Sequence, residues 1–269
     1  MKNTSKIVLL LVMVGFFLSC SDYNKVLKGD NYERKFQLAE ELNTKKEFGK
    51  AIPLYEQIYQ RMPKSGEGEL SYFRIGKGYF EIEDFDMAGY YLGAFSQRYP
   101  YSPKAQEALF LSAMCSVQNS PEYSLDQNDT EMAINNLQQF VDTYPESILV
   151  DSCNHIMDRL RLKIERKDYD AVKLYAKTEN YRAAVTSSLT FIEEYPKSSY
   201  REEVYFVLVN NSYLLAVNSI ENKKCDRIEE TIERYRNFEV EFPNSAYKSQ
   251  ALGINDKMQR DFEINCNKK

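Results

Sequence analysis

The sequence predicts an all-α protein, a right-handed superhelical solenoid of five helix pairs followed by a C-terminal capping helix. Two observations lead to this prediction. First, five of the eight prolines lie in one P-x-S frame, in which a serine follows two positions after the proline. Second, large apolar residues recur at helical spacing between these frames, and small residues occupy repeated positions. The five frames are Pro63–Ser65, Pro100–Ser102, Pro145–Ser147, Pro196–Ser198 and Pro243–Ser245.

Each frame is predicted to form the turn between one helix pair and the next. Proline ends a helix because it has no backbone N–H and cannot continue the hydrogen-bond ladder. The serine is expected to cap the N-terminus of the following helix. Small residues such as Gly76 and Ala88 let two antiparallel helices approach closely, while Tyr72 and Phe95 fill the space beside them. This pattern resembles the tetratricopeptide repeat, a helix-turn-helix unit of about 34 residues.

The chain begins with a segment that is not predicted to belong to the fold. Lys2 and Lys6 precede twelve mostly apolar residues, 7–18, and then Cys20. This apolar run is too short to span a bilayer, which takes about 20 residues in a helix. Residues 1–19 are therefore predicted to be a cleaved signal peptide, and residues 20–30 a tether.

The apolar run followed by Cys20 resembles a bacterial lipobox, in which the cysteine thiol carries acyl chains such as palmitate. Ser21 instead of Asp after the cysteine favours the outer membrane. A plain secretory signal with an incidental cysteine is the alternative interpretation.

The helical array is predicted over residues 31–265. Successive frame prolines lie 37, 45, 51 and 47 residues apart, so the later units contain insertions. One insertion is predicted to be a long loop over 118–131, and another to lengthen a helix over 148–177. The predicted units are 31–65, 66–102, 103–147, 148–198 and 199–245, with the cap over 246–265.

The net charge argues against a nucleic-acid-binding protein, and the lack of a catalytic motif argues against an enzyme. The formal net charge is −5, and it becomes −7 when Lys2 and Lys6 are removed, which disfavours nucleic acid as a partner. The single histidine, His155, has no recognisable catalytic partner, and no metal-ligand spacing, phosphate-binding loop or cofactor motif is present. An anchored hydrolase would need such a cluster. The locally basic stretch 158–167 is read as a solvated helix face, with a docking patch as the alternative.

Cys225 and Cys266 are a candidate disulfide. Helices of a solenoid alternate in direction, so the sequence indicates at which edge of the array each helix begins and ends. Cys225 is expected in the loop after the first helix of the fifth unit, and Cys266 at the end of the cap, at the same edge of the array. Two independent surface thiols are the alternative, because disulfide geometry is demanding.

Three segments of the chain resemble the BamD family of outer-membrane β-barrel assembly lipoproteins, in its Bacteroidetes-like form. They are NSPEYSLDQNDTEMAINNLQQFVDTYPES, YREEVYFVLVNNSYLLAVNSIENKK and FEVEFPNSAY. The resemblance implies a non-enzymatic, periplasm-facing scaffold with a lipid anchor on Cys20 in the outer membrane. It also implies that the C-terminal repeats dock on the periplasmic domains of the central barrel protein. The N-terminal repeats would receive the C-terminal segments of unfolded barrel proteins. A lipoprotein scaffold for cell-wall or division factors is the alternative with the same fold.

A peptide-binding surface is predicted on the first helices of units one to three, which line the concave face in the repeat frame. Aromatic rings together with a lysine suit an extended peptide with a terminal aromatic residue and a carboxylate. The alternative is that these aromatic side chains close the core between repeats. The candidate residues are Phe36, Phe73, Lys77, Phe80 and Leu109.

Overall fold

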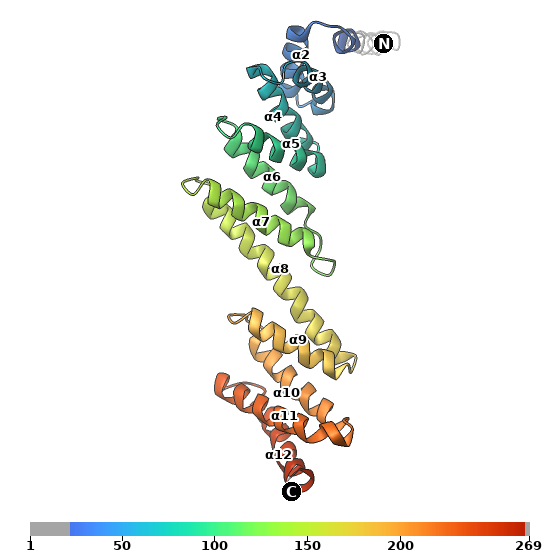
Figure 1. Ribbon diagram of the computed structural model, residues 1–269, viewed down its shortest axis with the longest axis vertical. Helices are drawn as coiled ribbons and strands as arrows, with labels where there is room; N and C mark the ends of the chain where they lie inside the picture. The colour runs from blue at the N-terminus through green and yellow to red at the C-terminus, as the bar shows by residue number, and fades with distance from the viewer. Residues whose placement is uncertain (1–21, 267–269) are drawn as a thin grey trace, which may run out of the picture. The chain divides into compact units, whose positions relative to one another are not determined.

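A computed structural model describes residues 22–266 of the chain (Figure 1). Within these residues every regular element is a helix, which confirms the predicted all-α class. Residues 22–28 are helical. The remaining helices are α2 (Tyr32–Thr44), α3 (Phe48–Arg61), α4 (Gly66–Glu81), α5 (Phe85–Arg98), α6 (Ala105–Asn119), α7 (Asn128–Thr143), α8 (Val150–Lys177), α9 (Tyr181–Glu194), α10 (Arg201–Val217), α11 (Glu221–Glu241) and α12 (Lys248–Asn265).

The helices form two compact units. The first unit runs to Asp158 without Tyr123–Leu125, and the second takes those three residues and the chain from Arg159. Helix α8 therefore contributes to both, and each unit has its own core. The predicted right-handed twist of the solenoid is a property of both units together, and it stays a prediction.

Small residues bring the two helices of each pair together. The second helices place Ala51, Ala88, Ala133, Ala184 and Thr231 at the contact, and each is at most 1% exposed. In the second pair, a Cβ on Gly76 would lie 2.8 Å from Leu92 Cγ, closer than side-chain carbons pack. Two turns further along, an aromatic or Ile residue fills the core beside the small one. These are Ile58, Phe95, Phe140, Phe191 and Phe238, each at most 1% exposed. The predicted tetratricopeptide-like helix pairing is thus confirmed.

The serine of the P-x-S frame behaves differently from the prediction at four of its five positions. Only Ser65 caps a helix, its Oγ accepting a hydrogen bond from the Gly68 amide of α4 at 3.0 Å. At the other four turns the helix starts three residues after the serine. There the serine Oγ accepts a hydrogen bond from the backbone amide two residues later. The predicted capping role was wrong there because the hydroxyl is used in the turn itself.

These four serines also bond to the first helix of the preceding pair. Ser102 donates to Glu69 at 2.6 Å, Ser198 to Glu165 at 2.5 Å, and Ser245 to Glu202 at 2.6 Å. At the remaining turn the direction is reversed, and Gln106 Nε2 donates to Ser147 at 2.6 Å. At these four turns the frame serine therefore ties the turn to the preceding helix pair by a side-chain hydrogen bond.

Replacing Ser198 by alanine is expected to lower the free energy of unfolding by about 1–3 kcal/mol, because the part-buried Glu165 carboxylate loses a donor. Urea unfolding followed by circular dichroism measures the change. The exposed neighbour provides the control, since Ser199→Ala is expected to stay within about 0.5 kcal/mol of the unsubstituted chain. Equal effects of the two substitutions would contradict a fastening role for the frame serine.

Candidate functional site

Phe73 of α4 is part of the core, so it cannot contact a peptide. Its side chain is 1% exposed, and its ring centroid lies 5.5 Å from that of Phe95 in α5. The prediction that Phe73 binds peptide was therefore wrong. The alternative, an aromatic residue that closes the core, describes this position.

Two lysines cover the buried Phe73 ring. Lys77 Nζ lies 5.8 Å and Lys104 Nζ 5.5 Å from the ring centroid, close enough for cation–π attraction. Both lysines share one acidic partner, because Glu107 of α6 accepts from Lys77 at 2.6 Å and from Lys104 at 3.3 Å. These three side chains together carry one net positive charge.

Glu107 stays ionised within this cluster. Burial alone would raise the pKa of its carboxyl, but the hydrogen bonds and charges of Lys77 and Lys104 outweigh that effect. The pKa of Glu107 is consequently lowered from its ordinary value, and its carboxylate keeps its charge at neutral pH.

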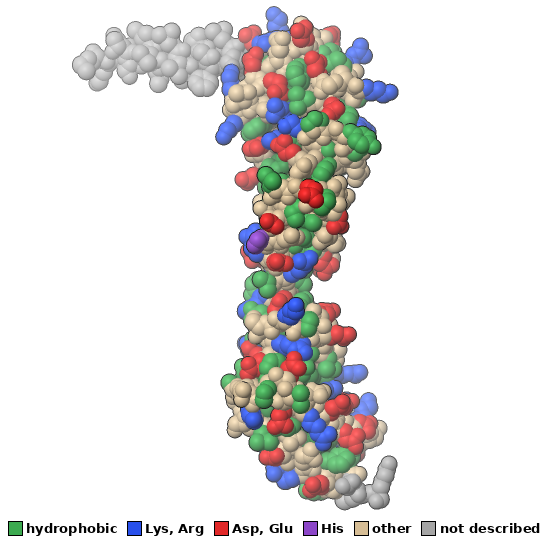
Figure 2. Space-filling view, turned by 90° about the vertical axis from the view of Figure 1, so that its left-hand side faces the viewer, with side chains coloured by type: hydrophobic (Ala, Val, Ile, Leu, Met, Phe, Trp, Pro, Cys, Tyr) green, Lys and Arg blue, Asp and Glu red, His purple; other side chains and the backbone are tan. Residues whose placement is uncertain are grey.

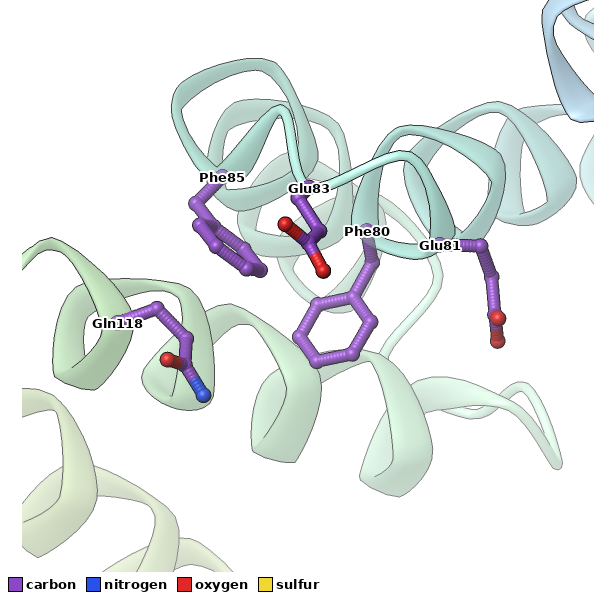
Figure 3. Close-up of a pocket in the computed structure, with 5 residues that line it drawn as sticks. All are labelled: Phe80, Glu81, Glu83, Phe85 and Gln118. Atoms are coloured by element: carbon purple, nitrogen blue, oxygen red, sulfur yellow. The ribbon is translucent and has the colours of Figure 1, made fainter.

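Phe80 lines an open pocket where α4 ends, next to the C-terminal part of α6. The pocket has a volume of about 370 Å³. Its walls are Phe80, Glu81, Glu83, Phe85 and Gln118. Figure 3 shows the Phe80 and Phe85 rings on either side of the Glu83 side chain, whereas Glu81 points away from the rings. The two rings are 5.7 Å apart in an edge-to-face arrangement. The rings suit an apolar side chain of a bound ligand, and the two glutamates favour a neutral or positive group next to that side chain.

The turn between α4 and α5 fixes the position of Glu83. The Glu83 amide bonds to the Phe80 carbonyl at 3.1 Å, and the Asp84 amide bonds to the Tyr79 carbonyl at 3.0 Å. This is the hydrogen-bond pattern of a Schellman motif, and it places Glu83 in the left-handed region at φ 62°. Asp84 then caps α5 by accepting from the Met87 amide.

The other predicted peptide-binding residues do not line this pocket. Phe36 and Leu109 are half-buried, and Phe36 packs against the core of the first unit. Sequence reasoning missed Phe85, Glu83 and Gln118. Phe85 could have been found, because an aromatic residue also opens the second helix of two other pairs, at Phe48 and Tyr181.

Cys225 and Cys266 form a disulfide at the end of the second unit. Their sulfurs are 2.12 Å apart and their Cα atoms 5.6 Å apart, across a sequence separation of 41. Cys225 lies near the start of α11 and not in the loop where it was expected, and the bridge joins it to the residue that follows α12. Cys115 and Cys153 are unpaired and buried, and burial raises the pKa of the Cys115 thiol to about 12.

Part of the basic stretch 158–167 is engaged within the second unit. Arg166 pairs with Asp170 at 3.0 Å, one turn further along α8, and Lys167 Nζ donates to the Leu125 carbonyl at 2.8 Å. These contacts agree with a helix face held by intramolecular bonds. His155 is exposed, and on the face that Figure 2 shows, acidic and basic side chains are interspersed.

The predicted signal peptide and Cys20 lie outside the described residues. Across residues 22–266, none of the helices combines the length and apolar character needed to cross a membrane.

A family model described as an outer membrane lipoprotein, YfiO, matches residues 30–188, more than half of the chain. The chain belongs to the YfiO family. Two curated relatives are outer membrane protein assembly factors named BamD. The one from Caulobacter vibrioides is 23% identical over 171 residues, which cover 64% of this chain and 56% of that relative. The one from Neisseria meningitidis serogroup B is 22% identical over 268 residues, which cover 93% of this chain and 97% of the relative.

Membership in the YfiO family supports the prediction of a non-enzymatic scaffold. Among solved structures, the apo form of RapI aligns with 89% of this chain and 78% of its own, at 13% identity and a TM-score of 0.36. That similarity is too low to support a conclusion about function.

Proposed function

We propose that the chain is a scaffold lipoprotein of the machinery that assembles outer-membrane β-barrel proteins. The observation that supports this proposal is the full-length similarity to an assembly factor, since the alignment with the Neisseria relative spans 93% of this chain. In the proposed arrangement Cys20 carries the lipid and holds the helices on the periplasmic side of the outer membrane.

The C-terminal repeats would dock on the periplasmic domains of the central barrel protein. The N-terminal repeats would receive segments of unfolded barrel proteins. The α4–α6 surface of the first unit provides a site for such a segment. Phe80 and Phe85 offer an aromatic pocket, and Lys77 lies one helical turn before Phe80 on the same face.

Charge determines how a client segment would lie on this surface. Glu81 and Glu83 at the pocket disfavour a carboxylate inside it, whereas the cluster of Lys77, Lys104 and Glu107 is net positive. The aromatic side chain of the client's last residue would therefore enter the pocket. The C-terminal carboxylate of the same residue would stay outside, next to the lysines. This arrangement refines the predicted peptide site, because Phe73 supports the lysines from below and does not touch the client.

Co-purification tests the function. The chain, extracted from outer membranes in mild detergent, is expected to bring down a large barrel protein. Recovery of cell-wall or division enzymes without a barrel protein would instead favour the alternative scaffold.

Phe80→Ala is expected to weaken binding of a peptide that ends in phenylalanine by about fivefold to thirtyfold, which corresponds to about 1–2 kcal/mol. Fluorescence anisotropy with a labelled peptide measures the loss. Ile82→Ala serves as the matched control, because Ile82 is 46% exposed and does not line the pocket. Glu83→Gln should strengthen binding of the same peptide by removing a repulsive charge. Binding that is unchanged in Phe80→Ala would exclude this pocket as the client site.

Cys20→Ala is expected to remove the lipid anchor and leave the protein soluble or with an uncleaved signal. Fractionation of membranes and mass spectrometry of the N-terminal peptide measure this outcome. A variant that still fractionates fully with outer membranes in the absence of its partner would show that the anchor lies elsewhere.

A further inference from the structure

A second aromatic surface lies on the first unit and shares no residue with the Phe80 pocket. It is an open groove of about 380 Å³ on α3, α4 and α5, called here the tyrosine groove. Its lining consists of Glu56, Tyr59, Gln60, Tyr72, Ile75, Tyr90, Tyr91 and Arg98. Four of these eight residues are tyrosines, so aromatic rings are a main component of the lining.

The tyrosines contact one another in a continuous row. Tyr59 stacks on Tyr72 with ring centroids 4.3 Å apart, and Tyr72 meets Tyr91 edge-on at 5.4 Å. Tyr90 then meets Tyr91 at 5.3 Å. Tyr72 is only 6% exposed and anchors the row in the core, whereas Tyr90 is 67% exposed at its end. The groove is therefore held in shape before any ligand arrives, which limits the entropy lost on binding.

Hydrogen-bond donors accompany the rings. The Arg98 guanidinium lies 5.9 Å from the Tyr59 ring centroid and 5.8 Å from that of Tyr72, and its side chain is exposed. Burial raises the pKa of both Tyr72 and Tyr91, so their hydroxyls remain protonated at neutral pH. Glu56 accepts from two tyrosines, since Tyr79 Oη donates to it at 3.5 Å and the Tyr91 hydroxyl also bonds to it. The exposed Arg98 and Tyr90 side chains are therefore the donors that the groove presents beside its aromatic rings, and they suit a ligand that brings acceptors.

A polyproline II segment has this combination of groups. Its backbone carbonyls have no internal hydrogen-bond partners, and its pyrrolidine rings pack flat on aromatic side chains. An amphipathic helix would instead need an aliphatic groove and would bring no free backbone carbonyls. Strand addition needs an open sheet edge, and residues 22–266 contain no strand. We propose that the tyrosine groove binds a proline-rich segment of a partner protein in the polyproline II conformation.

The lack of tryptophan in this chain makes the test direct. The probe is a decapeptide of nine prolines with one N-terminal tryptophan, whose emission is followed as the full-length protein in detergent is added. A Gly-Ser decapeptide with the same tryptophan is the control probe. Saturable binding of the proline probe is expected, with binding of the Gly-Ser probe at least about fivefold weaker.

Variants locate the binding to the groove. Tyr90→Ala and Arg98→Gln are each expected to weaken binding of the proline probe at least about fivefold. Both side chains are exposed, so neither substitution should disturb the fold. Tyr101→Ala is the matched control, because Tyr101 is 99% exposed and does not line the groove. Phe80→Ala should also leave the affinity unchanged, which separates this site from the client pocket. Absence of saturable binding, or equal affinity of both groove variants and the unsubstituted chain, would overturn the proposal.

Discussion

Replacing Phe73 by alanine is expected to lower the free energy of unfolding by about 3–5 kcal/mol, the usual cost of truncating a buried phenylalanine. The ring is 1% exposed and packs against Phe95, so its removal leaves a cavity in the core of the first unit. The two lysines above it also lose the aromatic face over which they lie. Chemical unfolding followed by circular dichroism measures the effect.

Phe73→Leu is the matched control, because it keeps an apolar side chain and should cost clearly less than the alanine substitution. Phe80→Ala provides the functional contrast, since it should reduce peptide binding with a smaller loss of stability. If Phe73→Ala unfolded like the unsubstituted chain but bound peptide more weakly, the ring would belong to the binding surface after all.

Loss of the Cys225–Cys266 disulfide is expected to lower the free energy of unfolding of the second unit by about 3–4 kcal/mol in the chain-entropy model. The reason is that the bridge closes a loop with a sequence separation of 41, which restricts the unfolded chain. Cys266 also packs against the core beside Phe262, so reduction should loosen the end of α12 first. Hydrogen exchange of the α12 amides, with and without a reducing agent, measures this loosening.

The double variant Cys225→Ser with Cys266→Ser controls for other effects of the reducing agent, because its stability should not depend on reduction. Oxidised and reduced forms of the unsubstituted chain that unfold at the same urea concentration would contradict a stabilising role for the bridge. Mass spectrometry that finds both thiols free in protein from the periplasm would show that the bridge does not form there.

The helix pairs could be predicted from the sequence because their determinants are local. Each frame proline stands two residues after the last residue of a helix, and small residues such as Ala88 and Ala184 recur at the helix contacts. The disulfide was also within reach, since it depends only on the alternating direction of helices and on their lengths. The role of the frame serines was not, because it depends on glutamates such as Glu69 and Glu165, which lie 33 residues earlier in the chain.

The binding surface was harder to predict because one helix does not reveal what covers it. Phe73 and Phe80 are seven residues apart and lie on nearly the same face of α4. Phe73 is nevertheless covered by α5 and by Lys104, whereas Phe80 lies at the end of the helix, where the turn leaves a pocket. The tyrosine groove escaped notice for a similar reason, since Tyr59, Tyr72 and Tyr90 come from three helices.

The disulfide also determines what a protease can remove from this protein. The turn between α11 and α12 contains Pro243 and Asn244, both exposed, and exposed turns are preferred sites of proteolytic cleavage. Because Cys225 lies before this turn and Cys266 after it, a single cut there leaves α12 covalently attached to α11. Release of the last helix therefore takes two events, cleavage and reduction. In an oxidising compartment a nicked molecule would keep its C-terminal helix, and the cut would become visible only on a reducing gel.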